Sequence, residues 1–153
     1  MRLEIGARAP GFTLPDQSGA PVRLADFAGQ RIVVYFYPAD DTPGCTTEAC
    51  QFNDELDAFD GLAVRVLGVS PNDGASHQRF IAKYGLNFTL LSDPERTVMT
   101  KYGAYGEKQL YGKTVTGVIR STFVIGPTGR VEHAWYCVRA TGYAARVLAA
   151  LTE

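Results

Sequence analysis

The sequence lacks a long apolar run. No stretch approaches the roughly 20 consecutive apolar residues that a membrane-spanning helix requires. The opening residues, MRLEIGARAPGFTLPD, lack the apolar core of a secretory signal peptide. We therefore expect a protein that has no membrane partner and resides in the cytoplasm.

The sequence also lacks an excess of charge of either sign. The 153 residues include 15 Lys and Arg against 16 Asp and Glu, a formal net charge of −1, and both signs are spread along the chain. A basic block would indicate nucleic acid and an acidic tail would indicate a basic partner, and the sequence has neither. It also has no internal repeat or low-complexity segment, so its length predicts a single domain over residues 1–153.

Cysteine is sparse, with Cys45, Cys50 and Cys137 the only three. In a reducing cytoplasm this argues against a structural disulfide framework and leaves burial, metal binding or redox chemistry. His133 could join the three thiols in a zinc site, but steps of five and four residues on different elements do not match the usual zinc spacings. We therefore expect no metal.

The apolar residues that are present follow an alternation of strands and helices. An unbroken β-branched and aromatic run at 31–37 is typical of a strand buried on both faces, and the segment LAVRVLGVS at 62–70 predicts another buried strand. The pattern also predicts strands at 88–93, 121–125 and 130–138, helices at 46–60, 73–85, 94–102 and 142–153, and a turn at 16–19. This order predicts an α/β domain with a mixed central sheet flanked by helices. A thioredoxin-like core with an N-terminal extension fits it, as does a flavodoxin-like sheet.

Cys45 lies where a predicted strand gives way to a predicted helix. If it occupies the first helical turn, unpaired backbone N–H groups and the helix dipole favour its thiolate. Thiolate formation alone raises the rate only about a few-fold, because nucleophilicity falls with the pKa. Fast chemistry therefore needs donors aimed at developing charge, and Thr42 and a cation from elsewhere are candidates. Pro38 and Gly44 shape the loop so that its backbone can approach a ligand closely.

Cys50 follows Cys45 by five residues. On an intact helix the two Cα atoms would lie ~8.6 Å apart, beyond the ~7 Å limit for a disulfide. The thiols could bond only if the first turns unwind, which the weak helix formers Thr46 and Thr47 would ease. The alternative is that Cys50 is simply a small buried residue of the helix.

The segment FYPADDTPGCTTEAC resembles the P-x-x-x-T-x-x-C active-site loop of peroxiredoxins, with Pro38, Thr42 and Cys45 in its three fixed positions. The C-x-x-x-x-C spacing is similar to that of the bacterioferritin comigratory protein (peroxiredoxin Q) subgroup. Further matching segments are GARAPGFTLPDQSG, VLGVSPND and LLSDPERTVMTKYGAYGEKQLYGKTVTGVIRSTFVIGPTGRV. The resemblance therefore covers nearly the whole chain.

The resemblance implies a thiol peroxidase on a thioredoxin-like fold that needs no metal or organic cofactor. Cys45 would be the peroxidatic cysteine, whose thiolate attacks the peroxide O–O bond and becomes a sulfenic acid. Thr42 and Gly44 would contribute to the peroxide site, with Thr42 donating a hydrogen bond. Arg120, the arginine that precedes STF, would favour the thiolate and stabilise the developing negative oxygen. Pro38 would shield the sulfenate from water.

Cys50 would then be the resolving cysteine. The resemblance implies a disulfide between Cys45 and Cys50 after local unwinding, which a thioredoxin- or glutaredoxin-type reductant reopens. The protein would be a monomeric, atypical two-cysteine peroxidase for hydrogen peroxide and organic hydroperoxides. Two alternatives remain: a thiol–disulfide oxidoreductase acting on proteins, for which a C-x-x-C spacing would be typical, and a redox-responsive binding module or zinc-bound structural protein.

Several other residues are assigned structural roles. We expect His77 to be a polar helix residue, Cys137 a structural residue on a strand, and Trp135 part of the core or a groove wall. The stretch from Tyr102 to Lys113, rich in tyrosine and lysine, is interpreted as a loop near the active site, since nucleic-acid stacking would need a wider basic field.

Overall fold

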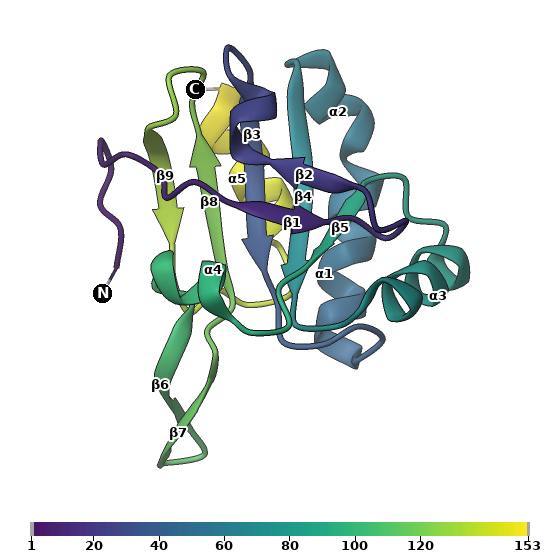
Figure 1. The fold of residues 1–153 in the computed structure, drawn as a ribbon, viewed down its shortest axis with the longest axis vertical. Coiled ribbons are helices and arrows are strands. Elements are labelled where there is room, and N and C mark those ends of the chain that lie inside the picture. The colour runs from purple at the N-terminus through teal and green to yellow at the C-terminus, as the bar shows by residue number, and fades with distance from the viewer. Residues whose placement is uncertain (1, 153) are drawn as a thin grey trace.

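The computed structural model describes residues 2–152 and is built around a five-stranded sheet of order β5-β4-β3-β8-β9 (Figure 1). Its strands are β3 (Arg31–Phe36), β4 (Val64–Ser70), β5 (Thr89–Ser92), β8 (Ser121–Ile125) and β9 (Val131–Trp135). β3, β4 and β5 are parallel, whereas β8 is antiparallel to β3 and β9 is antiparallel to β8. The sheet is therefore mixed as predicted, and its antiparallel part excludes a flavodoxin-like arrangement.

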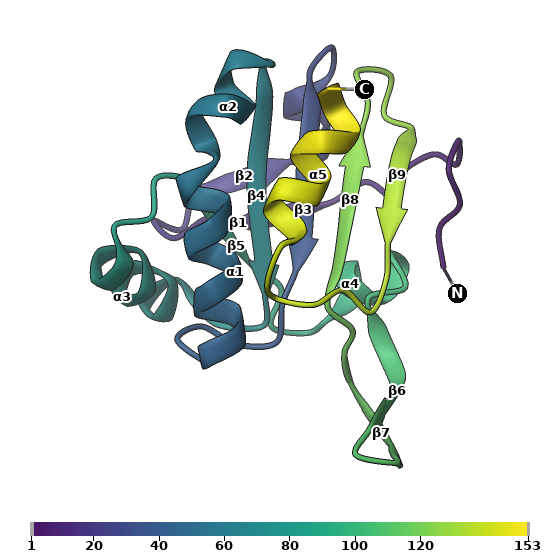
Figure 2. The same cartoon turned by 180° about the vertical axis from the view of Figure 1, so that it is seen from behind.

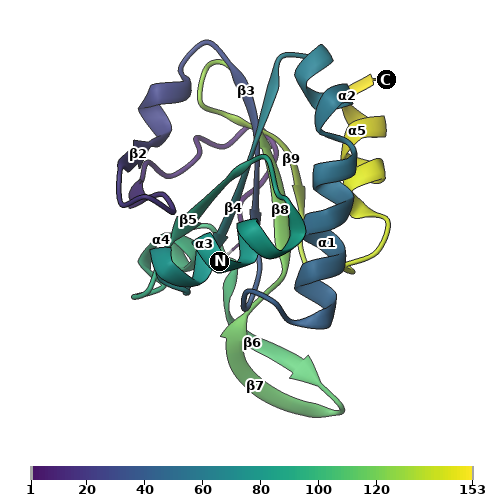
Figure 3. The same cartoon turned by 90° about the vertical axis from the view of Figure 1, so that its right-hand side faces the viewer.

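Helices cover the sheet from both sides. α1 (Pro43–Asp54), α2 (Leu56–Gly61) and α5 (Tyr143–Thr152) lie on one face (Figure 2). The hairpin of β1 (Thr13–Pro15) and β2 (Pro21–Arg23) and the short α4 (Thr97–Lys101) lie on the opposite side (Figure 3). α3 (Gly74–Tyr84) lies beside the edge strand β5 (Figure 1). The hairpin is the predicted N-terminal extension, and its turn is closed by a bond from the Asp16 N–H to the Ala20 carbonyl at 2.9 Å.

The unbroken apolar run of β3 is explained by two cores, one on each face of the sheet. Ile32, Val34 and Phe36 belong to the core under the N-terminal hairpin and α4. Val33 and Tyr35 alternate with them and belong to the core under α1 and α5. Because successive side chains of a strand point to opposite faces, a strand between two cores has no polar position.

α1 begins three residues earlier than the predicted helix at 46–60. Thr42 is its N-cap residue, and Pro43 occupies the first turn, where its missing N–H costs no hydrogen bond. Cys45 consequently lies in the first turn. At the other end, Asn53 donates to the Gly85 carbonyl at 3.0 Å and accepts from the Asn87 N–H at 2.7 Å. The C-terminal half of α1 is thereby fixed to the loop that follows α3.

The predicted helix at 94–102 is too long, since α4 spans only Thr97–Lys101. Arg96 has a left-handed backbone, φ +61°, which interrupts a helix that would start at Pro94. The buried carboxylate of Asp93 instead accepts a hydrogen bond from the Met99 N–H at 2.9 Å and caps the shorter helix.

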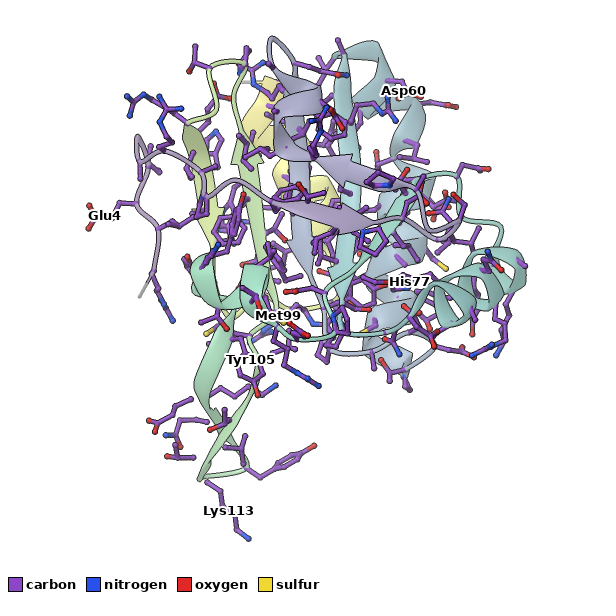
Figure 4. All side chains as sticks on the ribbon, viewed as in Figure 1. Glu4, Asp60, His77, Met99, Tyr105 and Lys113 are labelled. Atoms are coloured by element: carbon purple, nitrogen blue, oxygen red, sulfur yellow. The ribbon has the colours of Figure 1, made fainter. Side chains whose placement is uncertain are left out.

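The predicted loop between Tyr102 and Lys113 is wrong as well. β6 (Tyr105–Leu110) and β7 (Lys113–Val118) form a hairpin that projects from the body, with Lys113 near its tip (Figure 4). Its two-residue turn, Tyr111-Gly112, has positive φ at both positions, +53° and +78°. This is the turn geometry that matches the twist of paired strands, although Tyr is not typical at its first position.

No helix within residues 2–152 is long and apolar enough to cross a membrane.

The packing of α1 on the sheet yields a first prediction. Phe52 is fully buried and stacks on Tyr35 with ring centroids 4.7 Å apart. Phe52→Ala should lower the free energy of unfolding by about 3–5 kcal/mol, through lost burial and the cavity it leaves. Urea unfolding followed by circular dichroism measures this. Asp54→Ala, at an exposed position of the same helix, is the control and should change stability by less than about 0.5 kcal/mol. Equal effects of the two substitutions would contradict this packing.

Candidate active site

The candidate site lies at the carboxyl end of β3, where residues 37–42 lead into α1 (Figure 1). Sheet register brings a distant residue to the same place. β3 and β8 are antiparallel with Phe36 opposite Ser121, so Arg120 lies across from the residues that follow β3. Strand ends of this kind commonly carry the sites of α/β proteins.

Arg120 joins two groups of α1. Its Nη2 donates to the Cys45 Sγ at 3.1 Å, and its Nη1 donates to the Glu48 Oε1 at 2.6 Å. Cys45 exposes only 1% of its surface. The structure thus brings together the predicted cysteine and the predicted arginine, in a buried setting where a fixed positive charge acts strongly on a sulfur anion.

Gly44 leaves room for this guanidinium. A Cβ atom at position 44 would lie 3.4 Å from the Arg120 Nη2 and 3.7 Å from the Ala140 Cβ. A larger side chain at this position would have to displace one of them. The absence of a side chain therefore permits the arginine to lie against the first turn of α1.

Thr42 and Pro38 both precede Cys45 in the chain. The Thr42 hydroxyl makes no capping bond to the helix and instead donates to the Ala39 carbonyl at 3.1 Å. Its oxygen retains lone pairs that can accept a further hydrogen bond. Pro38 is half-buried and lines the same hollow as Arg120. Pro38 is therefore near the guanidinium that contacts Cys45, and Thr42 is the N-cap of the helix that carries Cys45.

Glu48 is a site residue that the sequence interpretation missed. It exposes 1% of its surface, and its Oε2 has no hydrogen-bond partner among the described residues. Burial raises the pKa of Glu48 to about 7, although the charge and hydrogen bond of Arg120 lower it. The buried positions 45, 48, 49 and 52 follow a helical stripe. An acidic residue within that stripe was the signal that could have identified Glu48.

Cys50 is half-buried on the same helix, and its thiol is free. Burial and the negative charge of Asp54 raise the pKa of Cys50, which favours its protonated form at neutral pH. α1 is continuous from Pro43 to Asp54, so the two thiols are kept apart as the helical spacing predicted.

A hollow of about 740 Å³ opens beside Arg120. The hairpin residues Lys108 and Glu107 form one wall, and Pro38 and Cys137 lie on others. Cys137 is exposed and follows the end of β9, so the prediction that it lies on a strand is wrong.

His133, the histidine of the zinc arrangement considered from the sequence, packs against a neighbouring aromatic side chain. His133 stacks on Trp135 with ring centroids 5.3 Å apart. Within residues 2–152, no three His, Cys, Asp or Glu side chains are grouped so that they could hold a metal ion.

His77 lies on α3, a helix position as expected, but it is buried and not exposed to solvent. Its side chain is fully buried, with the Nδ1 2.7 Å from the Asp40 Oδ2 and the Nε2 3.0 Å from the Leu91 carbonyl oxygen (Figure 4). Asp40 belongs to the loop between Pro38 and Thr42, so α3 is connected to the candidate site through this contact.

Comparison with known proteins identifies the family. The model of the AhpC/TSA family matches residues 5–134. A putative peroxiredoxin of Mycobacterium tuberculosis is 53% identical over 146 residues, 95% of this chain and 93% of the relative. Peroxiredoxin Bcp of Escherichia coli is 47% identical over 133 residues, 87% and 85% of the two chains.

A solved structure agrees with these relatives. The bacterioferritin comigratory protein of Xanthomonas campestris, described in terms of its alkyl peroxide reduction activity, superposes with a TM-score of 0.89 and 42% identity over 98% of this chain and 96% of that chain. Both the fold and the sequence matches extend over almost all of the chain. The chain therefore belongs to the AhpC/TSA family, as a peroxiredoxin of the bacterioferritin comigratory protein (peroxiredoxin Q) subgroup with a thioredoxin-like fold.

Proposed function

We propose that this peroxiredoxin reduces hydrogen peroxide and organic hydroperoxides through Cys45, forms a disulfide with Cys50, and is recycled by a thioredoxin- or glutaredoxin-type reductant. We further propose that it acts in the cytoplasm as a monomer with one domain over residues 1–153. The observation that carries the proposal is the Arg120 guanidinium 3.1 Å from the buried Cys45 sulfur in the first turn of α1.

In the first step the Cys45 thiolate attacks one peroxide oxygen and the O–O bond breaks. The sulfur gains that oxygen and becomes a sulfenic acid, while the bond's electron pair leaves on the other oxygen, which is protonated to water or an alcohol. Arg120 would stabilise the departing negative oxygen. Because its two N–H contacts already fix the guanidinium, little reorganisation is needed as this charge develops.

Thr42 would orient the peroxide. Its hydroxyl already donates to the Ala39 carbonyl, so its free lone pairs could accept the O–H of a hydroperoxide, or the hydroxyl could turn to donate to the peroxide. Pro38 would limit access of water to the oxidised sulfur. The hollow beside Arg120 has room for an organic substituent, which supports the inclusion of alkyl hydroperoxides among the substrates.

In the second step the Cys50 thiol attacks the Cys45 sulfenic acid, which forms the disulfide and releases water. The intact helix prevents this, so the turns around Cys45 must unwind first. Asn53 and the buried Phe52 fix the far end of α1, which would confine the unwinding to its N-terminal half. The burial of Cys45 argues against the alternative function, direct attack on disulfides of other proteins.

Cysteine substitutions test the two thiol roles. Cys45→Ser should abolish peroxide turnover. Cys50→Ser should complete about one turnover and then accumulate a sulfenic acid, because no neighbouring thiol on α1 remains to resolve it. Intact mass spectrometry after one equivalent of peroxide, with dimedone to trap sulfenic acid, distinguishes these outcomes. Wild type should lose two hydrogens and show a Cys45–Cys50 bridge. A Cys50→Ser enzyme that cycles normally with thioredoxin would refute the resolving role, and Cys137→Ser should behave as wild type.

Arg120 can be tested separately. Arg120→Ala should lower kcat/KM for hydrogen peroxide by roughly 100- to 1,000-fold, the effect of removing one preorganised donor from a developing anion. Stopped-flow measurement of the first oxidation step gives the rate. Arg79→Ala removes an exposed arginine of α3 and is the matched control. Loss of less than about fivefold in Arg120→Ala would show that the guanidinium does not assist the reaction.

The raised pKa of Glu48 predicts a pH dependence of stability. The folded protein binds the Glu48 proton up to about pH 7, whereas the unfolded chain releases it near the ordinary value of 4.5. Wild type should therefore lose stability as the pH rises between these values, by about 3 kcal/mol from this group. Glu48→Gln should lack this loss, so that its stability relative to wild type increases over the same interval. Denaturant unfolding at pH 4.5 and 7.5 measures it, and parallel curves for the two proteins would contradict the assignment.

A further inference from the structure

We propose that the buried Asp40–His77 ion pair positions residues 37–42, the catalytic loop, and sets how readily the first turns of α1 unwind. The inference rests on the proposed function, because unwinding matters only if Cys45 and Cys50 must meet. His77 would be a positioning residue, since it acts on Cys45 through the loop that contains Asp40. His77 lies outside the P-x-x-x-T-x-x-C motif.

The pair is buried and fully bonded. The side chains of His77 and Asp40 are 0% and 3% exposed, with the Nδ1 and Oδ2 atoms 2.7 Å apart. The same carboxylate accepts from the Tyr37 hydroxyl at 2.6 Å and from the Ser76 hydroxyl at 2.8 Å. The Asp40 N–H in turn donates to the Asn72 Oδ1 at 2.9 Å. Asp40 is therefore fixed through both its side chain and its backbone.

The two acceptors around His77 indicate that the ring is charged. The Nε2 lies 3.0 Å from the Leu91 carbonyl oxygen, which can only accept, and the Nδ1 faces the Asp40 carboxylate. A neutral ring beside an ionised Asp40 would direct a lone pair at one of these oxygens, so we infer that both nitrogens donate. Burial would raise the pKa of Asp40, but hydrogen bonds from His77 and Tyr37 outweigh it and hold the pKa below its usual value. The contact is thus an imidazolium–carboxylate pair, and removal of one partner leaves a buried charge unpaired.

The pair is connected to Cys45 by a short piece of chain. Thr42, the N-cap residue of α1, donates its hydroxyl to the carbonyl of Ala39, which directly precedes Asp40. While Asp40 is fixed to α3, the loop keeps this conformation and α1 starts at Pro43. If Asp40 is released, the loop and the first turn can move together, which favours the unwound form.

A second contact between the same loop and α3 provides a control. Asp41 accepts from Lys83 at 2.8 Å and from the Tyr84 hydroxyl at 2.6 Å. This ion pair is exposed, and exposed pairs contribute little because water and salt screen them. Lys83→Ala therefore removes a loop–α3 contact of similar length without affecting the buried pair.

The test measures two rates in single-turnover stopped flow, oxidation of Cys45 by hydrogen peroxide and the following disulfide formation. Relative to wild type, His77→Leu should slow oxidation and accelerate disulfide formation, each by roughly tenfold, the effect of losing one hydrogen bond to a charged group. His77→Asn, which can still donate to Asp40, should show smaller changes in the same directions. Sulfinic acid formed by excess peroxide should decrease, because the sulfenic acid is consumed sooner. Lys83→Ala should match wild type.

Two further measurements separate positioning from general damage. Met99 belongs to the core under the N-terminal hairpin, on the face of the sheet away from α1. Met99→Ala destabilises that core and should leave the ratio of the two rates unchanged. If His77→Leu does not fold, His77→Asn and ¹⁵N NMR of wild type still decide the question. The NMR spectrum should show both His77 ring nitrogens protonated at neutral pH. If wild type forms its disulfide normally, either a neutral His77 ring or unchanged rates in the folded His77 variants would overturn this inference. The proposed function would stand in that case. A wild type that does not react with peroxide at Cys45 would instead refute the proposed function.

Discussion

The contact of the Arg120 guanidinium with the Cys45 sulfur is the interaction on which the rest of the site depends. It exists because two antiparallel strands end at the same place, with Phe36 opposite Ser121. It also requires a helix that starts directly after the loop and a glycine against the guanidinium. The two-faced burial of β3 makes this frame rigid, since a shift of one strand would disturb both cores at once.

The Arg120 guanidinium contacts a second acidic group of α1, Glu48, besides Cys45. Glu48 and Cys45 lie on one buried face of α1 and share the N–H donors of Arg120, whose charge lowers the pKa of Glu48 against the effect of burial. A second buried contact, between Asp40 and His77, connects the loop before α1 to α3. The loop that precedes α1 is thus held at Asp40 by His77, and the helical turn that follows the loop is held at Cys45 by Arg120.

The sequence predicted most of the fold because its signals were local. The runs at 31–37 and 62–70 and the caps Asp73 and Gly85 are visible without tertiary information. The start of α4 and the β6–β7 hairpin were not predicted, because both depend on non-glycine residues with left-handed backbones, Arg96 and Tyr111.

The candidate site divides in the same way. The loop motif located Cys45, Thr42 and Pro38 in one short segment. The acidic residue within the buried stripe of α1 could have drawn attention to Glu48, but the partners of Glu48 and His77 lie 72 and 37 residues away in the chain, which no local pattern reveals. The half-buried position of Cys50 has one more consequence for the proposed cycle. A reductant would reach the Cys50 sulfur of the disulfide more easily than that of Cys45, so Cys45 would be the leaving group. Cys45 would regain its contact with Arg120 only when α1 winds again, so the charge proposed to assist oxidation would also favour the return of the reduced form.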